Sequence, residues 1–333
     1  MKKYVYIALA ALTFAACSSD DDSRQSASRN ETQTPISLSG TLTSAQEVTR
    51  AKTTLQPTQI VNNMQVGVFF LDDVSEATEY SNIYDKRNLL YMADGTGKLT
   101  SDGNLPYYFP ADGNKLKIYA YAPYRTAEDG GWNLSGTNTF VVKKNQVDSA
   151  NYVASDLLYG IPVTPSGNPL QRTEDDILLQ FDHQLTKIVV KLVASYGMED
   201  LMGTINGVYI NNTKRTATVT MGTVADNNPN LIASITASGT ADGEGTDGLM
   251  MGNSKADCAA IVVPQTVVAG TNMLHITTSN GGTFDWAPSE DFKLLPGKVY
   301  TITGTLQLNK ITVYTQVNEW LPGADDPAPT IEK

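Results

Sequence analysis

The sequence predicts an all-β fold, and three observations support this. Apolar and polar residues alternate along many short segments, turn residues separate those segments, and no long window repeats with the helical period of 3.6 residues. The chain of 333 residues is long enough for two domains. Its 41% hydrophobic and 18% charged residues are typical of a folded chain rather than a disordered one.

The N-terminal segment predicts a secretory signal peptide. Lys2 and Lys3 precede an uncharged, mainly apolar run over 4–16. Its 13 residues are too few for a membrane-spanning helix, which needs about 20. Small residues directly before Cys17 resemble a bacterial lipoprotein cleavage site, so we predict cleavage between Ala16 and Cys17 and a lipid on Cys17. The alternative is an ordinary signal peptide that ends near Ala16, with Cys17 incidental.

Residues 17–34 are polar and poor in apolar side chains, which predicts a lipidated flexible tether rather than part of a core. Alternating segments then begin. Their residues are, in order, 36–42, 66–71, 116–121, 187–192, 232–236, 300–308 and 311–317.

Gly- and Asn-rich turns separate these predicted strands, for example at 94–95, 112–114 and 280–282. We expect short helical turns only near 85–90 and 196–201. Residues 164–176 are rich in Pro, Gly and charge, as linkers tend to be. The predicted division is a signal peptide over 1–16, the tether over 17–34, an N-terminal β-sandwich domain over 35–172 and a C-terminal β-sandwich domain over 173–333.

Several short motifs follow one another in a fixed order over almost the whole mature chain. They are TRA at 49–51, PYYFP at 106–110 with LKIYAYAPY at 116–124, DLLYG at 156–160, FDHQLTK at 181–187, IVVPQ at 261–265, LPGKVY at 295–300 and VNEW at 317–320. Together with the lipoprotein start, this order resembles the Bacteroidales fimbrillin family, the Mfa-like or major-fimbrial-subunit-like surface lipoproteins. The serine and acidic cluster at 18–22 likewise resembles the surface-export signal of lipoproteins from this group.

The resemblance implies two transthyretin-like β-sandwich domains in tandem and a pilus subunit of the cell surface that contributes to adhesion, not an enzyme. The implied partners are other fimbrial subunits, the outer membrane through the lipid on Cys17, and host or bacterial surface glycans or proteins. In polymerising members an arginine-specific surface protease removes the first strand, and a strand of the next subunit replaces it.

In this chain the implied cleavage falls between Arg50 and Ala51, after the predicted strand over 36–42. The alternative is that Arg50 is an ordinary loop residue. The segment over 310–317 is either the donated strand or a permanent strand of the second domain.

The chemistry-bearing residues predict no catalytic, metal or cofactor site. The net charge of -11 argues against a nucleic-acid partner, because a phosphate backbone repels an acidic surface. The GEGTDG segment at 243–248 matches a dinucleotide-binding pattern but carries acidic residues, so we interpret it as an acidic loop. His183 is expected to be a strand-end histidine held by hydrogen bonds.

A set of tyrosines leaves one alternative function open. It comprises Tyr107, Tyr108, Tyr119, Tyr121 and Tyr124. These rings are suited either to packing in the core or to a sugar-binding platform. The second interpretation describes a non-polymerising surface lipoprotein that binds carbohydrate.

Overall fold

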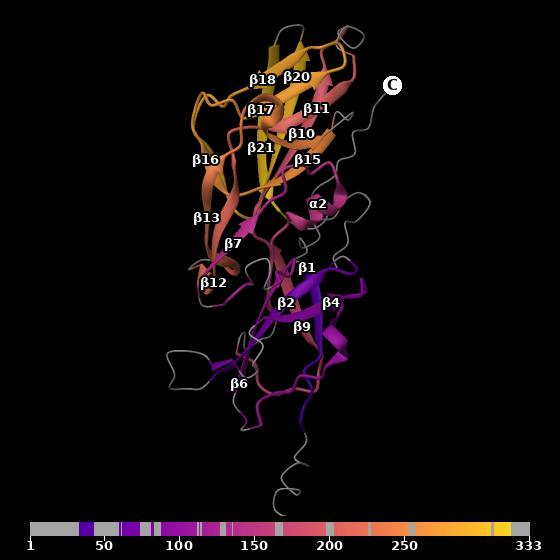
Figure 1. Ribbon diagram of the computed structural model, residues 1–333, viewed down its shortest axis with the longest axis vertical. Helices are drawn as coiled ribbons and strands as arrows, with labels where there is room; N and C mark the ends of the chain where they lie inside the picture. Colours follow the sequence, from indigo (N-terminus) through magenta and orange to yellow (C-terminus); the bar gives the residue numbers. More distant parts are fainter. Residues whose placement is uncertain are drawn as a thin grey trace, which may run out of the picture.

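The computed structural model describes most of the chain between residues 33 and 320. The described residues are 33–42, 60, 62–73, 81–82, 88–111, 113, 115–126, 131–134, 136–163, 169–197, 203–225, 228–252, 257–307 and 310–320. Strands make up 58% of them, which confirms the prediction of a β fold. The molecule is elongated, with the strands of the first half at one end and those of the second half at the other (Figure 1).

Eight of the nine strands described between residues 38 and 183 form one sheet, and the region that they make up is called the first half below. They are β1 (Leu38–Leu42), β2 (Gln65–Asp73), β3 (Ser81–Asn82), β4 (Leu89–Ala93), β5 (Lys98–Ser101), β6 (Lys115–Ala122), β8 (Leu158–Pro162) and β9 (Ile177–His183). Their order is β3-β2-β4-β5-β1-β9-β8-β6. Because β2 pairs with β4 along one edge and with β6 along the other, seven of these strands close on themselves.

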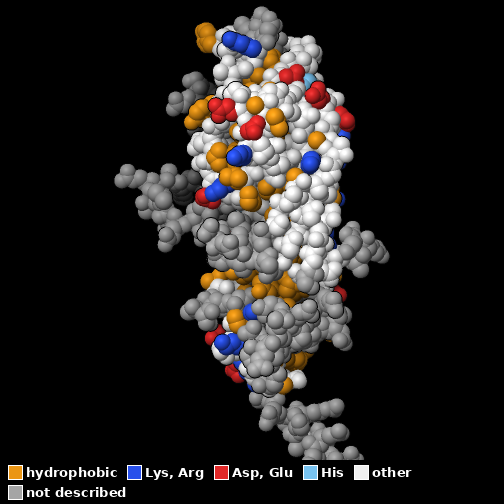
Figure 2. All heavy atoms as spheres, turned by 90° about the vertical axis from the view of Figure 1, so that its left-hand side faces the viewer, with side chains coloured by type: hydrophobic (Ala, Val, Ile, Leu, Met, Phe, Trp, Pro, Cys, Tyr) orange, Lys and Arg blue, Asp and Glu red, His pale blue; other side chains and the backbone are white. Residues whose placement is uncertain are grey.

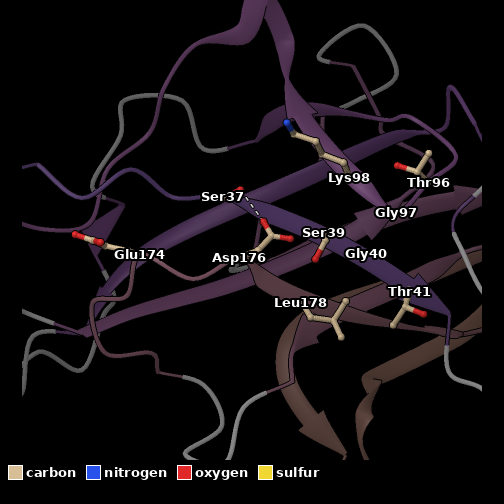
Figure 3. Close-up of a pocket in the computed structure, with 10 residues that line it drawn as sticks. All are labelled: Ser37, Ser39, Gly40, Thr41, Thr96, Gly97, Lys98, Glu174, Asp176 and Leu178. Carbon is tan, nitrogen blue, oxygen red and sulfur yellow. Dashed lines mark hydrogen bonds between the residues drawn. The ribbon is translucent and has the colours of Figure 1, made fainter.

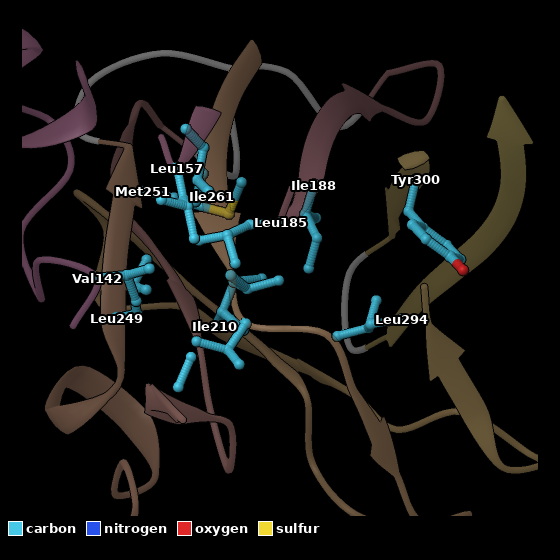
Figure 4. Close-up of a cluster of buried hydrophobic side chains, with 14 of the residues drawn as sticks. Val142, Leu157, Leu185, Ile188, Ile210, Leu249, Met251, Ile261, Leu294 and Tyr300 are labelled. Atoms are coloured by element: carbon cyan, nitrogen blue, oxygen red, sulfur yellow. The ribbon is translucent and has the colours of Figure 1, made fainter. Parts of the chain in front are cut away.

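The second half contributes β10 (Thr186–Ala194), β11 (Ile205–Ile210), β12 (Lys214–Ala225), β13 (Asn228–Ala241), β14 (Leu249–Gly252), β15 (Asp257–Val262), β16 (Gln265–Val267), β17 (Leu274–Thr278), β18 (Thr283–Trp286), β19 (Phe292–Leu294), β20 (Lys298–Gln307) and β21 (Lys310–Glu319). Two four-stranded sheets, β15-β10-β20-β21 and β14-β11-β17-β18, contribute side chains to one core. Ile188 from the first of these sheets and Ile210 from the second both lie in it (Figure 4). The strands β16 and β19 form a separate pair.

The alternation in β2 divides its side chains between two cores. Val66, Val68 and Phe70 belong to the core inside the closed sheet of the first half. Phe69 and Leu71, on the opposite face, belong to the core of the second half. Successive residues of a strand point to opposite faces, so this strand is apolar on both. The closed sheet therefore packs its outer face on the second half along part of its surface.

The sheets exchange strands across the expected linker over 164–176. The strand β7 (Thr137–Val141) lies before it but pairs with β12 in the sheet β13-β12-β7. The strand β9 lies after it but pairs with β1 and β8. The division into domains at 172 and 173 stays a prediction.

Helical structure is sparse in the described part of the chain, and residues 85–87 and 198–201 of the two predicted helical turns lie outside it. The helix α2 (Ser149–Ala154) begins after Asp148, whose Oδ1 accepts the backbone N–H groups of Ala150 and Asn151 at 2.7 and 3.3 Å. The short 3₁₀ turns are η2 (Asp102–Asn104) and η3 (Gly245–Asp247). Where a helical turn was predicted near 85–90, the described residues enter β4 at Leu89. Among the helices described, none is long and apolar enough to cross a membrane.

The surface in Figure 2 carries acidic and basic side chains scattered singly rather than in one patch. On the face shown, the described residues form no continuous basic surface. A basic stripe would be the electrostatic footprint of a nucleic-acid partner.

Candidate functional site

The strand β1 occupies an interior position in the closed sheet. Its residues 38–42 pair in parallel with 177–181 of β9. On its other side, Leu38 and Ser39 pair with Leu99 and Lys98 of β5 in the antiparallel sense. Removal of β1 would therefore leave two strand edges with unpaired backbone groups on either side of one groove.

The inward face of β1 follows the alternation that the sequence predicted. Ile36, Leu38 and Gly40 are buried, and Leu42 packs against the same core. Full burial of one such aliphatic side chain is worth about 1.5–3 kcal/mol. The prediction of a strand with Ile36, Leu38 and Leu42 on one face is thus confirmed.

The outward face of β1 is polar. Ser37, Ser39 and Thr41 line an open hollow, to which neighbouring segments add Lys98 and Asp176 (Figure 3). The Ser37 hydroxyl donates a hydrogen bond of 2.6 Å to the Asp176 carboxylate. Leu178 of β9 is the one large apolar side chain among the described residues that line the hollow, so β1 is held mainly by its core-facing side chains and its backbone hydrogen bonds.

Backbone hydrogen bonds extend the pairing of β1 beyond the strand itself. The N–H of Ile36 donates to the Tyr107 carbonyl at 2.7 Å, and the N–H of Phe109 donates to the Thr34 carbonyl at 3.0 Å. The N–H of Gly40 donates to the Gly97 carbonyl at 2.7 Å. The segment from Thr34 to Leu42 therefore acts as one unit that is inserted into the sheet.

The last strand, β21, lies at the edge of its sheet. Ten consecutive residue pairs join it to β20, from Lys298 with Glu319 to Gln307 with Lys310. Among the strands described, none pairs with its other edge. Tyr314 and Val317 are largely exposed, at 68% and 49%. The predicted strand over 310–317 is confirmed, and whether it is donated to another subunit stays a prediction.

His183 lies at the end of β9, as a histidine held by its neighbours. Its Nδ1 is 2.9 Å from the Asp156 carboxylate, and its ring stacks on Trp320. No catalytic nucleophile is part of this arrangement as the structure describes it, and the expectation of a hydrogen-bonded strand-end histidine is confirmed.

The acidic residues around the GEGTDG segment point to different basic partners. Asp242 pairs with Arg215 at 2.8 Å, and Asp247 pairs with Lys144 at 2.6 Å. The hydrogen bond and the charge of Lys144 hold the pKa of Asp247 below its usual value. Nowhere in the described part of the chain do His, Cys, Asp and Glu side chains gather in a group that could hold a metal ion.

Two of the five tyrosines considered for a sugar platform are buried in the core. Tyr121 stacks on Trp132 with ring centroids 4.5 Å apart, and its hydroxyl accepts hydrogen bonds from Asn88 and from the Arg125 backbone. Burial raises the pKa of Tyr121 to about 12. Tyr119 is also buried and stacks on Tyr159. Tyr107, Tyr108 and Tyr124 are half-buried. The packing interpretation therefore holds for Tyr119 and Tyr121.

The predicted processing residues lie outside the described part of the chain. These are Ala16 and Cys17 at the predicted signal-peptide cleavage, and Arg50 and Ala51 at the predicted maturation cleavage. The structure describes the strand that ends at Leu42, on the N-terminal side of Arg50.

Comparisons with known proteins identify one family and a similar fold. A family model described as Fimbrillin-like matches residues 49–320. A proposed cell adhesion protein from Bacteroides uniformis has a similar fold, with a TM-score of 0.60 at 20% identity over 86% of this chain and 98% of that one. A second, from Bacteroides ovatus, gives 0.57 at 15% identity over 87% and 99%.

A fimbrial protein from Bacteroides vulgatus gives a TM-score of 0.46 at 16% identity over 85% of this chain and 99% of that one. The search of curated proteins gives no match. At these identities the two matches with TM-scores of 0.60 and 0.57 establish the fold alone, and the family model carries the family assignment.

Proposed function

Because the chain belongs to the fimbrillin-like family, we propose that it is a pilus subunit assembled by protease-triggered strand exchange. Members of this family are structural adhesion proteins and not enzymes, so this chain is a fimbrial protein of the cell surface. Its export as a lipoprotein, its maturation cleavage and its assembly by strand exchange are proposed here.

The proposed route begins with a lipoprotein signal peptide over 1–16 and a lipid on Cys17. The tether, predicted over 17–34, then spans the distance from the outer membrane to the folded part of the chain, to which its last residue, Thr34, already belongs. Lipid anchoring is stable when more than one acyl chain inserts, since each buried CH₂ group contributes about 0.8 kcal/mol. The folded part is proposed to be two tandem transthyretin-like domains, 35–172 and 173–333, which exchange β7 and β9.

The observation that carries the assembly step is the position of β1. This strand is interior to the sheet, polar on its outer face, and separated from the rest of the chain by the predicted cleavage between Arg50 and Ala51. Once that bond is cut, β1 is held only by non-covalent contacts. Its departure would expose the edges of β5 and β9, and unpaired strand edges bind an added strand strongly.

The partners of this process are an arginine-specific surface protease and other fimbrial subunits. The adhesive target is proposed to be a glycan or protein on a host or bacterial surface. The carbohydrate-binding alternative gains no support from Tyr119 and Tyr121, because both rings are buried.

The test uses a recombinant chain that begins at residue 18, treated with an arginine-specific endopeptidase. N-terminal sequencing locates the cut, and light scattering after size exclusion gives the oligomeric state. We expect a fragment that begins at Ala51 and the appearance of oligomers. The matched control, Arg50→Lys, keeps the charge but is not cut there and should stay monomeric.

Two results would contradict the proposal. One is a wild-type chain that is cut at Arg50 and remains a monomer. The other is equal oligomer formation by Arg50→Lys, which would show that cleavage at this site is irrelevant. Cuts at Arg24 or Arg29 only shorten the tether and should not produce oligomers.

A further inference from the structure

The ring of Phe181 lies between two glycines on the strands that flank β9. Phe181 is fully buried and pairs directly with Gly160 of β8. A Cβ atom placed on Gly160 would lie 2.7–2.8 Å from three ring carbons. A Cβ atom placed on Gly40 of β1 would lie 3.1 Å from the ring. Glycine at both positions therefore makes room for the ring.

The space beside Gly40 is bounded by residues outside β1. A Cβ atom there would lie 2.7 Å from Cδ1 of Ile60, 3.1 Å from Cε2 of Phe181 and 3.5 Å from Cδ1 of Leu99. Leu99 is on β5 and Phe181 on β9, so these walls would remain if β1 left. The size limit is a property of the groove and not of the strand that now fills it.

Phe181 cannot yield this space by moving toward β8. The ring already lies so close to Gly160 that a Cβ atom there would collide with it. The backbone of β8 therefore blocks movement of the ring in that direction. Protein cores are packed to near-crystalline density, and extra methyl groups force neighbouring side chains out of their preferred rotamers. A single methyl at this position requires a small shift of the Ile60 side-chain end and a shift of a few tenths of an ångström at the Phe181 ring, whereas a β-branched side chain adds further atoms to this crowded space.

Resting on the proposed strand exchange, we propose that the groove selects its incoming strand by one small residue. The strand that replaces β1 has glycine or alanine at the register of Gly40. It has large apolar residues two and four positions earlier, where Leu38 and Ile36 are buried. The ring of Phe181 limits the size of the side chain at this position.

This requirement identifies the kind of partner. In the edge strand β21, one set of alternating residues is Ile311, Val313, Thr315 and Val317, and the other is Thr312, Tyr314 and Gln316. Neither set contains glycine or alanine. The thirteen residues after Trp320 contain three prolines, which suit an interior strand poorly. The groove therefore prefers a strand from a subunit of different sequence, and β21 of a second copy enters it more weakly.

The test measures peptide uptake by the wild-type chain after cleavage at Arg50. The probes are fluorescein-labelled peptides, the parent being TPISLSGTL, the sequence of residues 34–42. Two variants carry Gly40→Ala and Gly40→Val. The matched control carries Ser39→Val, which adds a similar bulk on the outward face. A fifth probe is KITVYTQVNE, the sequence of β21. Fluorescence anisotropy gives each dissociation constant.

We expect the parent, the Gly40→Ala peptide and the Ser39→Val peptide to bind with similar affinity. The Gly40→Val peptide and the β21 peptide should bind at least about tenfold more weakly. In the Phe181→Leu protein, the difference in affinity between the Gly40→Val peptide and the parent peptide should be smaller. The peptide affinities of the wild-type protein test the size limit even if the Phe181→Leu protein fails to fold.

The two ways of failing are distinguishable. If the parent peptide binds and the Gly40→Val peptide binds within about twofold of it, the size limit is wrong and strand exchange stands. If the parent peptide does not enter the cleaved protein at all, both the size limit and the proposed strand exchange are overturned.

Discussion

The indole ring of Trp320 stacks on the imidazole ring of His183, with centroids 4.0 Å apart and planes 3° from parallel. Trp320 directly follows β21, and His183 ends β9, so the contact joins the last strand to the sheet of the first half. The backbone N–H of Trp320 also donates to the Gly297 carbonyl at 2.8 Å. Asp156 holds the imidazole ring at its edge, 2.9 Å from Nδ1 of His183. Trp320 thus fixes the end of an otherwise exposed edge strand.

Trp320→Ala should remove this attachment. Trp320 is only 6% exposed, and truncation of a buried aromatic side chain costs about 3–5 kcal/mol. We expect a loss of this size in the free energy of unfolding from urea titration, with faster amide exchange along β21. Tyr314→Ala, an exposed position on the same strand, should change stability by no more than about 0.5 kcal/mol. Equal effects of the two substitutions would show that Trp320 does not anchor the strand.

Gly160→Ala should destabilise the sheet of the first half through Phe181. The added methyl meets the ring at 2.7–2.8 Å, and overpacking of this kind costs about 1–3 kcal/mol. In a double-mutant cycle with Phe181→Leu, the penalty of Gly160→Ala should shrink, because the smaller side chain removes the collision. Strict additivity of the two substitutions would contradict the packing described here.

Tyr121→Phe should cost about 1–2 kcal/mol at neutral pH. The hydroxyl of Tyr121 accepts a hydrogen bond of 2.8 Å from the Asn88 side chain and one of 3.1 Å from the Arg125 backbone. Loss of the acceptor leaves these partly buried donors to find other partners. Tyr314→Phe, at an exposed phenol, is the matched control and should be neutral. Urea titration of both variants makes the comparison, and equal stability of Tyr121→Phe and wild type would contradict it.

Stability should fall in alkaline solution. Burial raises the pKa of Tyr121 from 10.0 to about 12, and burial followed by the charge of Asp257 raises the pKa of the Cys258 thiol from 9.0 to about 12. The folded state therefore keeps protons that the unfolded state releases. The contribution of these groups is fully present below about pH 9 and is lost between pH 9 and 12. The urea midpoint should drop over this range, and Tyr121→Phe should reduce the drop above pH 10. A midpoint that stays constant to pH 11 would contradict this.

The local features of the fold could be predicted from the sequence, and the long-range ones could not. The alternation of Ile36, Leu38 and Leu42 predicts a half-buried strand, and β1 has that pattern. Nothing in such a pattern states which strands become neighbours, so the transfer of β7 and β9 across the linker went unpredicted. The helix α2 is shorter than two turns, too short for a periodic signal, although Asp148 is a recognisable cap.

In the candidate site, too, the sequence indicates the local feature but not its distant partner. Gly40 interrupts an otherwise alternating strand, and such a glycine often marks a close approach of another group. The group itself, Phe181, is distant in sequence, and only the parallel pairing of β1 with β9 brings the two together. The contact of Trp320 with His183 is likewise set by tertiary packing, although both residues lie in motifs that the sequence singled out.

The most direct test of the account locks β1 in place. Ser39 and Leu178 are paired residues on neighbouring strands and both line the outer hollow, so Ser39→Cys with Leu178→Cys should form a disulfide there. Neighbouring strands lie about 4.8 Å apart, within the range of Cα separations that disulfides bridge. After cleavage at Arg50, the oxidised protein should remain monomeric and the reduced protein should form oligomers, as should the single variant Ser39→Cys. Oligomers of the oxidised double variant at the wild-type level would contradict the claim that β1 must leave.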